Sequence, residues 1–296
     1  MDMKRKGKLT SHLIFHIGRW IPDKLYLRLL YRLKMHSRLD LEAPKTFNEK
    51  LQWLKLNDWQ PRYTQMADKK AAKEYVAGII GEKYIIPTLG CWDRFEDIDF
   101  DRLPDQFVLK VTHDSGGLCV CRDKSSFDVE AAKKKIEGAL KNDFFLYGRE
   151  RPYKDIPRKI ICEKYMQDGD NLELTDYKFY CFHGEPRFLY LSEGLEDHET
   201  AKISFANLDW SFAPFHRMDF APFQELPPKP DKLEEMIELS RELSRDTLFL
   251  RVDLYEINGE VYFGELTFTP CSGFMPFAPR EWDAKVGDML HLPIDK

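Results

Sequence analysis

Ionisable residues interrupt two apolar segments near the C-terminus. Arg251 and Asp253 lie on the first segment and Glu265 on the second, and Asn258-Gly259 separates them. A carboxylate on an apolar strand needs a compensating cation, and two converging carboxylates repel each other unless a metal ion or a proton lies between them. Mg²⁺ prefers oxygen ligands beside phosphate oxygens. The pattern predicts a magnesium site on a β-hairpin; the alternative is a surface hairpin whose charges lie in water.

The length of the hairpin loop decides whether the two carboxylates share a face. A two-residue loop sets Asp253 opposite Gly264, and because side chains alternate between faces, Asp253 and Glu265 then point to opposite sides. A three-residue loop with Gly259 in the left-handed region shifts the pairing by one residue. Asp253 then becomes a same-face diagonal neighbour of Glu265. We therefore predict the three-residue loop.

A lysine lies inside an earlier apolar strand. Lys110 interrupts residues 107–112, where a buried cation without a partner is costly and the polyanion of a nucleotide phosphate would offset that cost. Ser115, Gly116 and Gly117 follow as a flexible turn whose N–H groups can close over phosphates. The alternative is a lysine at a strand end that reaches solvent.

Two later strands carry further polar residues. An apolar strand ends at Glu163, Lys164 and Tyr165, an edge that can present polar groups to an adenine, with Glu163 accepting from the adenine amine. On the following strand, alternation puts Asp176 and Lys178 on one face. Lys178 can meet the charge of a transferring phosphate, or pair with Asp176.

The order of these features resembles the ATP-grasp superfamily: a phosphate lysine, a glycine-bearing loop, a hinge with Glu, a second cationic strand, and then R-x-D and E-x-N motifs before a Pro-Gly turn. More narrowly, residues 22–293 look like the TupA-like branch, named for teichuronopeptide biosynthesis. The segments that carry this resemblance as a set are 46–53, 67–69, 103–110, 176–179 and 265–270.

The resemblance implies ATP and Mg²⁺ as cofactors and a role for each candidate residue. The implied catalytic residues are Lys178, near the γ-phosphate, and Arg251, which would hold a tetrahedral oxyanion. The implied metal ligands are Asp253, Glu265 and Thr267. The implied nucleotide-binding residues are Lys110, Ser115, Gly116, Gly117, Glu163, Lys164 and Tyr165, with Asp170 or Glu173 at the ribose.

The architecture implied by the resemblance is an α+β, ATP-grasp fold. It has an N-terminal helical and α/β region over residues 1–104, a small α+β lid over residues 105–162, and a catalytic subdomain with an antiparallel sheet and helices over residues 163–296. ATP is expected in the cleft between the lid and that sheet.

The implied reaction is ATP-dependent carboxylate–amine ligation. A carboxylate attacks the γ-phosphoryl group to give an acylphosphate, and an amine then displaces phosphate. Such phosphoryl transfer needs charge neutralisation and alignment more than covalent help. By resemblance, the carboxylate belongs to a uronic acid of a surface polysaccharide or its precursor, in a capsular or teichuronopeptide-like pathway. The amine would come from an amino acid or an amino sugar.

Three positions depart from the family pattern. Thr267 replaces the metal-binding Asn that usually follows Glu265 by two residues, and a hydroxyl is a poorer Mg²⁺ ligand than an amide carbonyl. Asp114 adds a negative charge to the glycine-bearing loop, so we expect it to cap a turn or to point away. Arg151 stands where the family has the aromatic residue of a W-P-Y motif.

Two other function classes remain open at this stage. A glycosyltransferase would need a D-x-D metal motif, which Asp97, Asp99 and Asp101 supply formally. That run lacks a nucleotide-sugar-binding βαβ context and is typical of a solvated acidic loop. A kinase-like or non-catalytic nucleotide-binding protein is the other class, because of Thr267 and Asp114.

Charge is distributed unevenly along the 296 residues. The net charge of −5 gives no general attraction to nucleic acid, yet residues 1–38 hold ten Lys or Arg against two Asp, a net of +8. Leu25, Leu29 and Leu33 follow helical spacing within this segment. The segment can contact an anionic membrane surface, hold an acidic glycan, or pack as a basic helix on the acidic body.

Composition and targeting patterns favour a globular cytoplasmic enzyme. Hydrophobic residues make up 43% and aromatic residues 14% of the chain. We recognise no signal peptide and no apolar run long enough to span a membrane. The six cysteines include no C-x-x-C pair, so we expect reduced thiols, a cytoplasmic location and, through the basic segment, contact with the inner membrane face.

The periodicity predicts the elements that hold these residues. Residues 9–80 are predicted to be helical, with the clearest segments at 47–56 and 68–76. Further helices are predicted at 128–141 and 231–245, a β-hairpin around the glycine-bearing loop up to residue 122, and strands over 160–191. Residues 210–230 are rich in Pro and are expected to be irregular.

Overall fold

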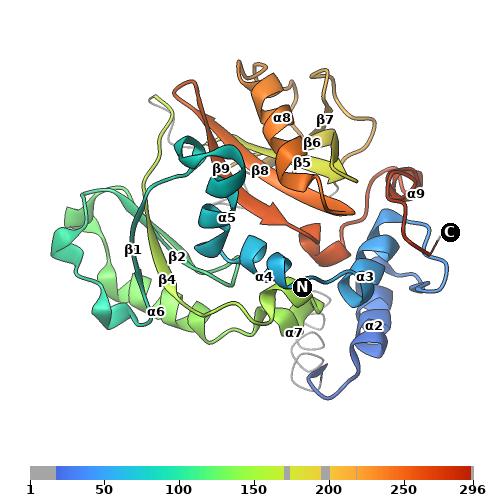
Figure 1. The fold of residues 1–296 in the computed structure, drawn as a ribbon, viewed down its shortest axis with the longest axis horizontal. Coiled ribbons are helices and arrows are strands. Elements are labelled where there is room, and N and C mark those ends of the chain that lie inside the picture. The colour runs from blue at the N-terminus through green and yellow to red at the C-terminus, as the bar shows by residue number, and fades with distance from the viewer. Residues whose placement is uncertain (1–17, 170–173, 195–200, 218, 295–296) are drawn as a thin grey trace.

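The computed structural model describes residues 18–169, 174–194, 201–217 and 219–294. Within these residues, helices surround two antiparallel sheets that lie side by side, which confirms the predicted α+β class (Figure 1). The helices are α2 (Asp23–Met35), α3 (Phe47–Asn57), α4 (Pro61–Ala67), α5 (Ala71–Ile80), α6 (Val129–Leu140), α7 (Phe144–Gly148), α8 (Leu233–Ser244) and α9 (Glu281–Gly287). The strands are β1 (Thr88–Trp92), β2 (Phe107–Val111), β3 (Leu118–Cys121), β4 (Ile160–Lys164), β5 (Asp176–Phe182), β6 (Glu185–Glu193), β7 (Lys202–Asn207), β8 (Phe249–Ile257) and β9 (Glu260–Thr267).

The larger sheet has the order β7-β6-β5-β8-β9 and is covered on both faces. Strand alternation sends Phe179 and Val252 into a core with α5 and α8. The opposite face carries Phe182 and Phe249, which pack on Phe47 of α3 with ring centroids 5.7 and 5.0 Å away. Further along β5 and β8, the same face of the sheet carries charged residues instead of aromatic ones. The packing of the aromatic residues on α3 therefore holds in place the strands that carry the charged residues.

The smaller sheet has the order β1-β4-β2-β3 and includes a strand from before residue 105. One of its faces is apolar: Phe107, Leu109 and Cys162 pack against Ile136 of α6. Lys110 alternates with Leu109 and therefore lies on the other face. The proposed lid boundary of 105–162 thus leaves β1 outside a sheet to which it is hydrogen-bonded.

The β8–β9 hairpin corrects one expectation. Ile257 pairs with Glu260, so the loop has two residues, and the expected three-residue loop is wrong. Asn258 and Gly259 have φ of 52° and 76°, the left-handed pair that favours a type I′ turn. The register instead shifts further along, where Gly264 is the extra residue of a β-bulge. Asp253 consequently pairs directly with Glu265 and shares its face.

Most of the other predicted elements are confirmed where the structure describes them. The helix predicted at 128–141 is α6, and Asp128 caps it by accepting from the Ala131 N–H at 2.9 Å. The run around Asp99 forms two 3₁₀ turns that bury Phe95 and Ile98, while Asp97 pairs with Arg94 and Asp99 with Arg102 at the surface. Among the described helices, none combines the length and apolarity needed to cross a bilayer.

Candidate functional site

Two carboxylates and one arginine form the centre of the ionic face. Arg251 Nη2 lies 2.7 Å from Asp253 Oδ2 and 2.6 Å from Glu265 Oε1, and Arg251 Nε donates to Asp253 Oδ1 at 2.7 Å. Thr267 pairs with Arg251 across the strands, and its hydroxyl donates to Glu265 at 3.1 Å. The carboxylates therefore converge on a single point, and the guanidinium of Arg251 compensates both.

Lys178 completes this group from the neighbouring strand β5. It pairs with Asp253 across the sheet, and its Nζ lies 2.7 Å from Asp176 Oδ2 and 3.5 Å from Asp253 Oδ2. The side chain of Lys178 is 9% exposed. The predicted pairing of Lys178 with Asp176 is confirmed, and its contact with a transferring phosphate stays a prediction.

The two carboxylates differ in burial and in pKa. The Asp253 side chain is 2% exposed, and burial raises its pKa to about 6 although Arg251 and Lys178 oppose the shift. The Glu265 side chain is 44% exposed. Burial would raise the pKa of Glu265, but Arg251, Lys69 and Lys178 outweigh it and hold the pKa at about 2. Glu265 is therefore ionised at any physiological pH, whereas Asp253 titrates near neutrality.

A second ionic group lies on the inner face of the smaller sheet. Glu163 forms ion pairs of 2.5 Å with both Lys110 and Lys73. Burial would raise the pKa of Glu163, but the two lysines outweigh it and hold the pKa at about 2. Each oxygen of Glu163 is bound by a lysine, and the expected contact of Glu163 with an adenine amine stays a prediction. Its carboxylate sets the positions of two ammonium groups.

Lys69, between α4 and α5, links the two groups. Its Nζ donates to the carbonyl of Asp114 at 2.7 Å, and its backbone N–H donates to Thr112 at 3.2 Å. Burial lowers the pKa of Lys69, and the charges that act on it next are those of Glu265 and Lys110. A residue of the larger sheet and one of the smaller sheet therefore lie within electrostatic reach of the same ammonium group.

The glycine-bearing loop divides into an open part and a packed part. Ser115 and Gly116 are exposed, whereas Gly117 is buried and a Cβ there would meet Ala139 and Val111 at 2.6 Å. Asp114 accepts from the Gly116 N–H at 3.0 Å, which confirms the expected turn cap. The exposed Ser115-Gly116 tip is the part of the loop that can approach a ligand.

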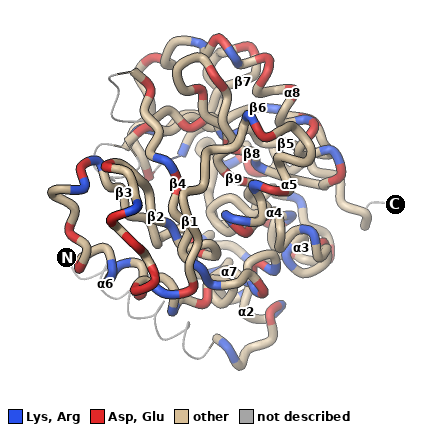
Figure 2. The backbone as a smooth tube through the Cα atoms, turned by 60° about the vertical axis from the view of Figure 1, so that its left-hand side comes forward, with Lys and Arg blue, Asp and Glu red and all other residues tan. Residues whose placement is uncertain are grey.

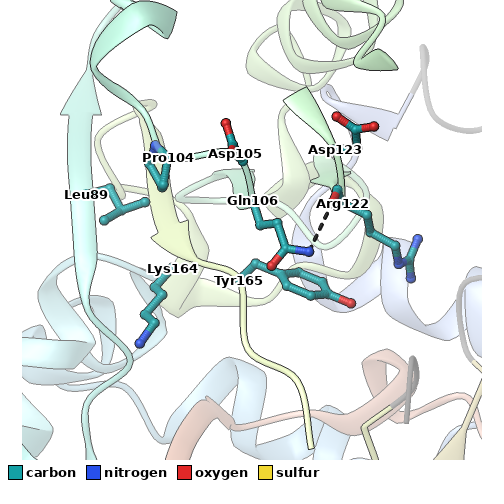
Figure 3. A pocket seen from close by; sticks show the side chains of 8 residues that line it. All are labelled: Leu89, Pro104, Asp105, Gln106, Arg122, Asp123, Lys164 and Tyr165. Atoms are coloured by element: carbon teal, nitrogen blue, oxygen red, sulfur yellow. Dashed lines mark hydrogen bonds between the residues drawn. The ribbon is translucent and has the colours of Figure 1, made fainter. Parts of the chain in front are cut away.

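The end of the smaller sheet is hollowed where β4 leaves it. Lys164 and Tyr165 line an open hollow of about 720 Å³ together with Leu89 and Pro104 (Figure 3). The Gln106 amide donates to the carbonyl of Arg122 at 3.0 Å on the same wall. Gln106 and Lys110 lie roughly 13 Å apart along β2, at about 3.3 Å per residue. This spacing suits a nucleotide with its base at one end and its phosphates at the other.

Two expected ribose contacts cannot be placed in this arrangement. Asp170 and Glu173 lie outside the described residues. The hydrogen bonds of the adjoining segment are described: Asp168 accepts from the Asn258 N–H at 2.8 Å, and Gly169 N–H donates to the Asn258 side chain at 3.0 Å. The segment that follows Tyr165 is thus attached to the turn of the β8–β9 hairpin.

Residues 49–291 match the family model described as TupA-like ATPgrasp. The chain belongs to the TupA-like ATP-grasp family. Membership confirms the predicted ATP-grasp fold and the expected use of ATP with Mg²⁺. A comparison with curated proteins finds no match.

Solved ATP-grasp structures resemble the chain at a distance. D-alanine–D-alanine ligase from Bacillus anthracis, complexed with ATP, has 15% identity and a TM-score of 0.42, over 76% of this chain and 64% of that one. An L-amino acid ligase from Bacillus licheniformis has 12% identity and a TM-score of 0.44, over 83% and 55%. The chain therefore spans less than two thirds of the length of either ligase.

The donor atoms of this ATP-grasp site fit Mg²⁺. One nitrogen of Arg251 lies within 2.7 Å of an oxygen of Asp253 and of Glu265, so a single cation can reach both carboxylates. In the part of the chain that the structure describes, no cluster of three or more His, Cys, Asp or Glu could hold a metal. Two carboxylates suffice for Mg²⁺, which takes its other ligands from water and substrate phosphates.

The sequence interpretation assigned no role to several residues of this TupA-like site. Lys69 and Lys73 were part of a predicted Ala- and Lys-rich helix, where lysines are usually solvated. Glu150 is buried and accepts from Thr269, two residues beyond Thr267. Burial raises the pKa of Tyr153, and the charges acting on it include Glu265 and Arg251. The sequence feature that could have identified Lys69 and Lys73 as site residues is their i,i+4 spacing beside the Ala67-Asp68 segment.

Proposed function

We propose that the chain is an ATP-dependent carboxylate–amine ligase that acts through an acylphosphate. The observation that carries the proposal is the ionic face of β5, β8 and β9, where Arg251 bridges Asp253 and Glu265 and Lys178 lies beside Asp253. Phosphoryl transfer requires this arrangement of cations and carboxylates, because its charge is spread over phosphate oxygens and must be neutralised in a fixed geometry.

Each residue then has a defined task. Asp253 and Glu265 would hold Mg²⁺, with Thr267 beside them to fix the orientation of Glu265 or to serve as a further ligand. Bound Mg²⁺ would neutralise charge on the phosphate oxygens. Lys178 would contact the γ-phosphate and Arg251 the tetrahedral oxyanion, both from the ionic face.

The nucleotide would run along the smaller sheet. Lys110 would bind the α- and β-phosphates, with Glu163 keeping its ammonium group apart from that of Lys73. The exposed Ser115-Gly116 tip would close over the phosphates, and Lys164 and Tyr165 would border the base in the hollow at the sheet end. The lid is proposed to comprise residues 105–162, between the regions 1–104 and 163–296.

We further propose a uronic-acid-type carboxylate of a surface polysaccharide or its precursor as the acceptor, and an amino acid or other amine as the donor. The family match supports this choice of pathway. The reaction would take place in the cytoplasm, at the inner face of the membrane. The D-x-D run gives no support to a glycosyltransferase, because Arg94 pairs with Asp97 and Arg102 with Asp99.

The test is a coupled assay of ADP and phosphate release with a panel of uronic acids and amino acids. ADP formation that needs both a carboxylic acid and an amine, with a new amide detected by mass spectrometry, supports the ligase. ADP formation with an acid alone and a stable phosphorylated product would identify a kinase instead. Turnover of a sugar nucleotide without ATP would reject the proposal.

A further inference from the structure

Helix α2 exposes an apolar row that the proposed ligation does not use. Leu25, Leu29 and Leu33 recur every four residues and therefore lie on one face, where they are 51%, 44% and 52% exposed. Trp20 lies just before the helix and is 84% exposed. Single exposed leucines are ordinary, but an aligned row next to an exposed tryptophan marks a surface that contacts another phase or molecule.

The opposite face of α2 is already occupied by the body of the protein. Leu27 and Leu30 are buried in the core shared with α3. Arg149 forms an ion pair with Asp23 at 2.8 Å, and its guanidinium lies 4.0 Å from the centre of the Tyr26 ring. These contacts hold α2 against the body of the protein, and the helix lies at the margin of the molecule (Figure 2).

Basic side chains border the leucine row. Arg28 and Arg32, also four residues apart, precede Leu29 and Leu33 by one position and form a parallel exposed row. Arg28 also pairs with the exposed Glu42 at 2.9 Å, so Arg32 carries the less compensated charge of the two. Arg19 is exposed beside Trp20. Residues 1–38 carry a net charge of +8, whereas the whole chain carries −5. The basic residues are therefore concentrated in the part of the sequence that contains α2.

We propose that this face of α2 docks on an anionic phospholipid bilayer. Leucine side chains would enter the boundary between head groups and acyl chains, with Trp20 at the head-group level and the arginines on lipid phosphates. An acidic glycan would use the arginines but leave the leucines in water. A second copy of the chain would bring like charges together. The inference concerns where the enzyme works and does not depend on which bond it forms.

The test uses co-sedimentation of the full chain with vesicles. Wild-type protein is expected to bind vesicles that contain phosphatidylglycerol, and to bind pure phosphatidylcholine vesicles at least about tenfold more weakly. The variant L25S/L29S/L33S should lose at least about tenfold in partition to the anionic vesicles. The matched control I79S/F212S removes residues that are 42% and 45% exposed elsewhere, and it should bind like wild type.

Further measurements distinguish bilayer binding from the other possible roles of the leucine row. Trp20→Ala alters a residue outside the helix, so it should weaken vesicle binding without changing the melting temperature. Wild-type protein that binds neither vesicle type, or a triple variant that binds as wild type does, overturns the proposal. A wild-type dimer that the triple variant converts to a monomer would instead assign the row to a second copy. ADP formation without vesicles should be the same in all variants, which separates this result from that of the ligation assay.

Discussion

Asp253 faces Glu265 directly across β8 and β9, because Gly264 is inserted between the turn and the site as the extra residue of a bulge. With the two-residue turn alone, Asp253 would lie opposite Gly264, and the carboxylates would lie on different faces of the sheet. A Cβ at position 264 would lie 2.9 Å from the Tyr255 ring and 3.1 Å from the Asp253 carbonyl. The glycine therefore determines the geometry of the proposed metal site.

Gly264→Val is expected to lower both stability and ATP turnover. The added side chain must push Tyr255 and the backbone of Asp253 apart, which costs about 1–3 kcal/mol of unfolding free energy. Urea unfolding and ADP formation measure the two effects. Gly138→Ala is the control: nothing lies within 4 Å of its Cβ, so stability should rise slightly within α6. Full activity in Gly264→Val would contradict the role of the bulge.

Glu265→Gln is expected to abolish ATP turnover while the fold persists. Its side chain is 44% exposed, so the substitution leaves no buried charge unpaired, yet it removes one of two carboxylates from the cation site. ADP formation should fall by about 100-fold or more, with the melting temperature unchanged. Glu260→Gln, at the exposed start of the same strand, should keep its activity. An unaffected rate in Glu265→Gln would remove the metal assignment.

Lys110→Ala is expected to raise the KM for ATP by about tenfold or more and to change stability little. Lys110 is 29% exposed, and Glu163 keeps Lys73 as its partner after the substitution. Lys134→Ala, an exposed lysine of α6, is the matched control. A fall in melting temperature with no change in KM would make the lysine structural.

The stability of the protein is expected to depend on the titration of Asp253. Burial raises its pKa from the ordinary 3.8 to about 6. The folded state thus binds the proton more tightly than the unfolded state. The stability from this group is present below about pH 4 and is lost as pH rises through 6, by at most roughly 3 kcal/mol.

Urea unfolding of wild type and Asp253→Asn between pH 4 and 7 measures this contribution. The difference in unfolding free energy between the two proteins should change by that amount over the window, and a constant difference contradicts the shift. Wild-type ADP formation should decline as pH falls below 6, because a protonated Asp253 no longer binds a cation.

Side-chain positions within one strand were predictable from the sequence, whereas contacts between elements were less so. Alternation along one strand correctly placed Asp176 with Lys178. The register between β8 and β9 was inferred from the wrong feature. A bulge at Gly264 and a longer loop both shift the strand pairing by one residue, so the alternation pattern does not distinguish them.

Contacts between distant segments could not be derived from spacing. Lys73 and Glu163 are 90 positions apart in sequence, and their pairing depends on how α5 lies against the smaller sheet. Lys69 likewise reaches Asp114 through tertiary packing. Helix periodicity gave the existence of α5, but it carries no information about which β-strand the lysines of that helix meet.

Arg251 compensates both carboxylates within the protein itself. Folding is thereby independent of the divalent cation supply, unlike that of small metal-stapled domains. Purification in a chelator such as EDTA should leave the melting point where it is, and magnesium should raise it only when nucleotide is added with it. The arginine acts as an internal counter-ion for Asp253 and Glu265.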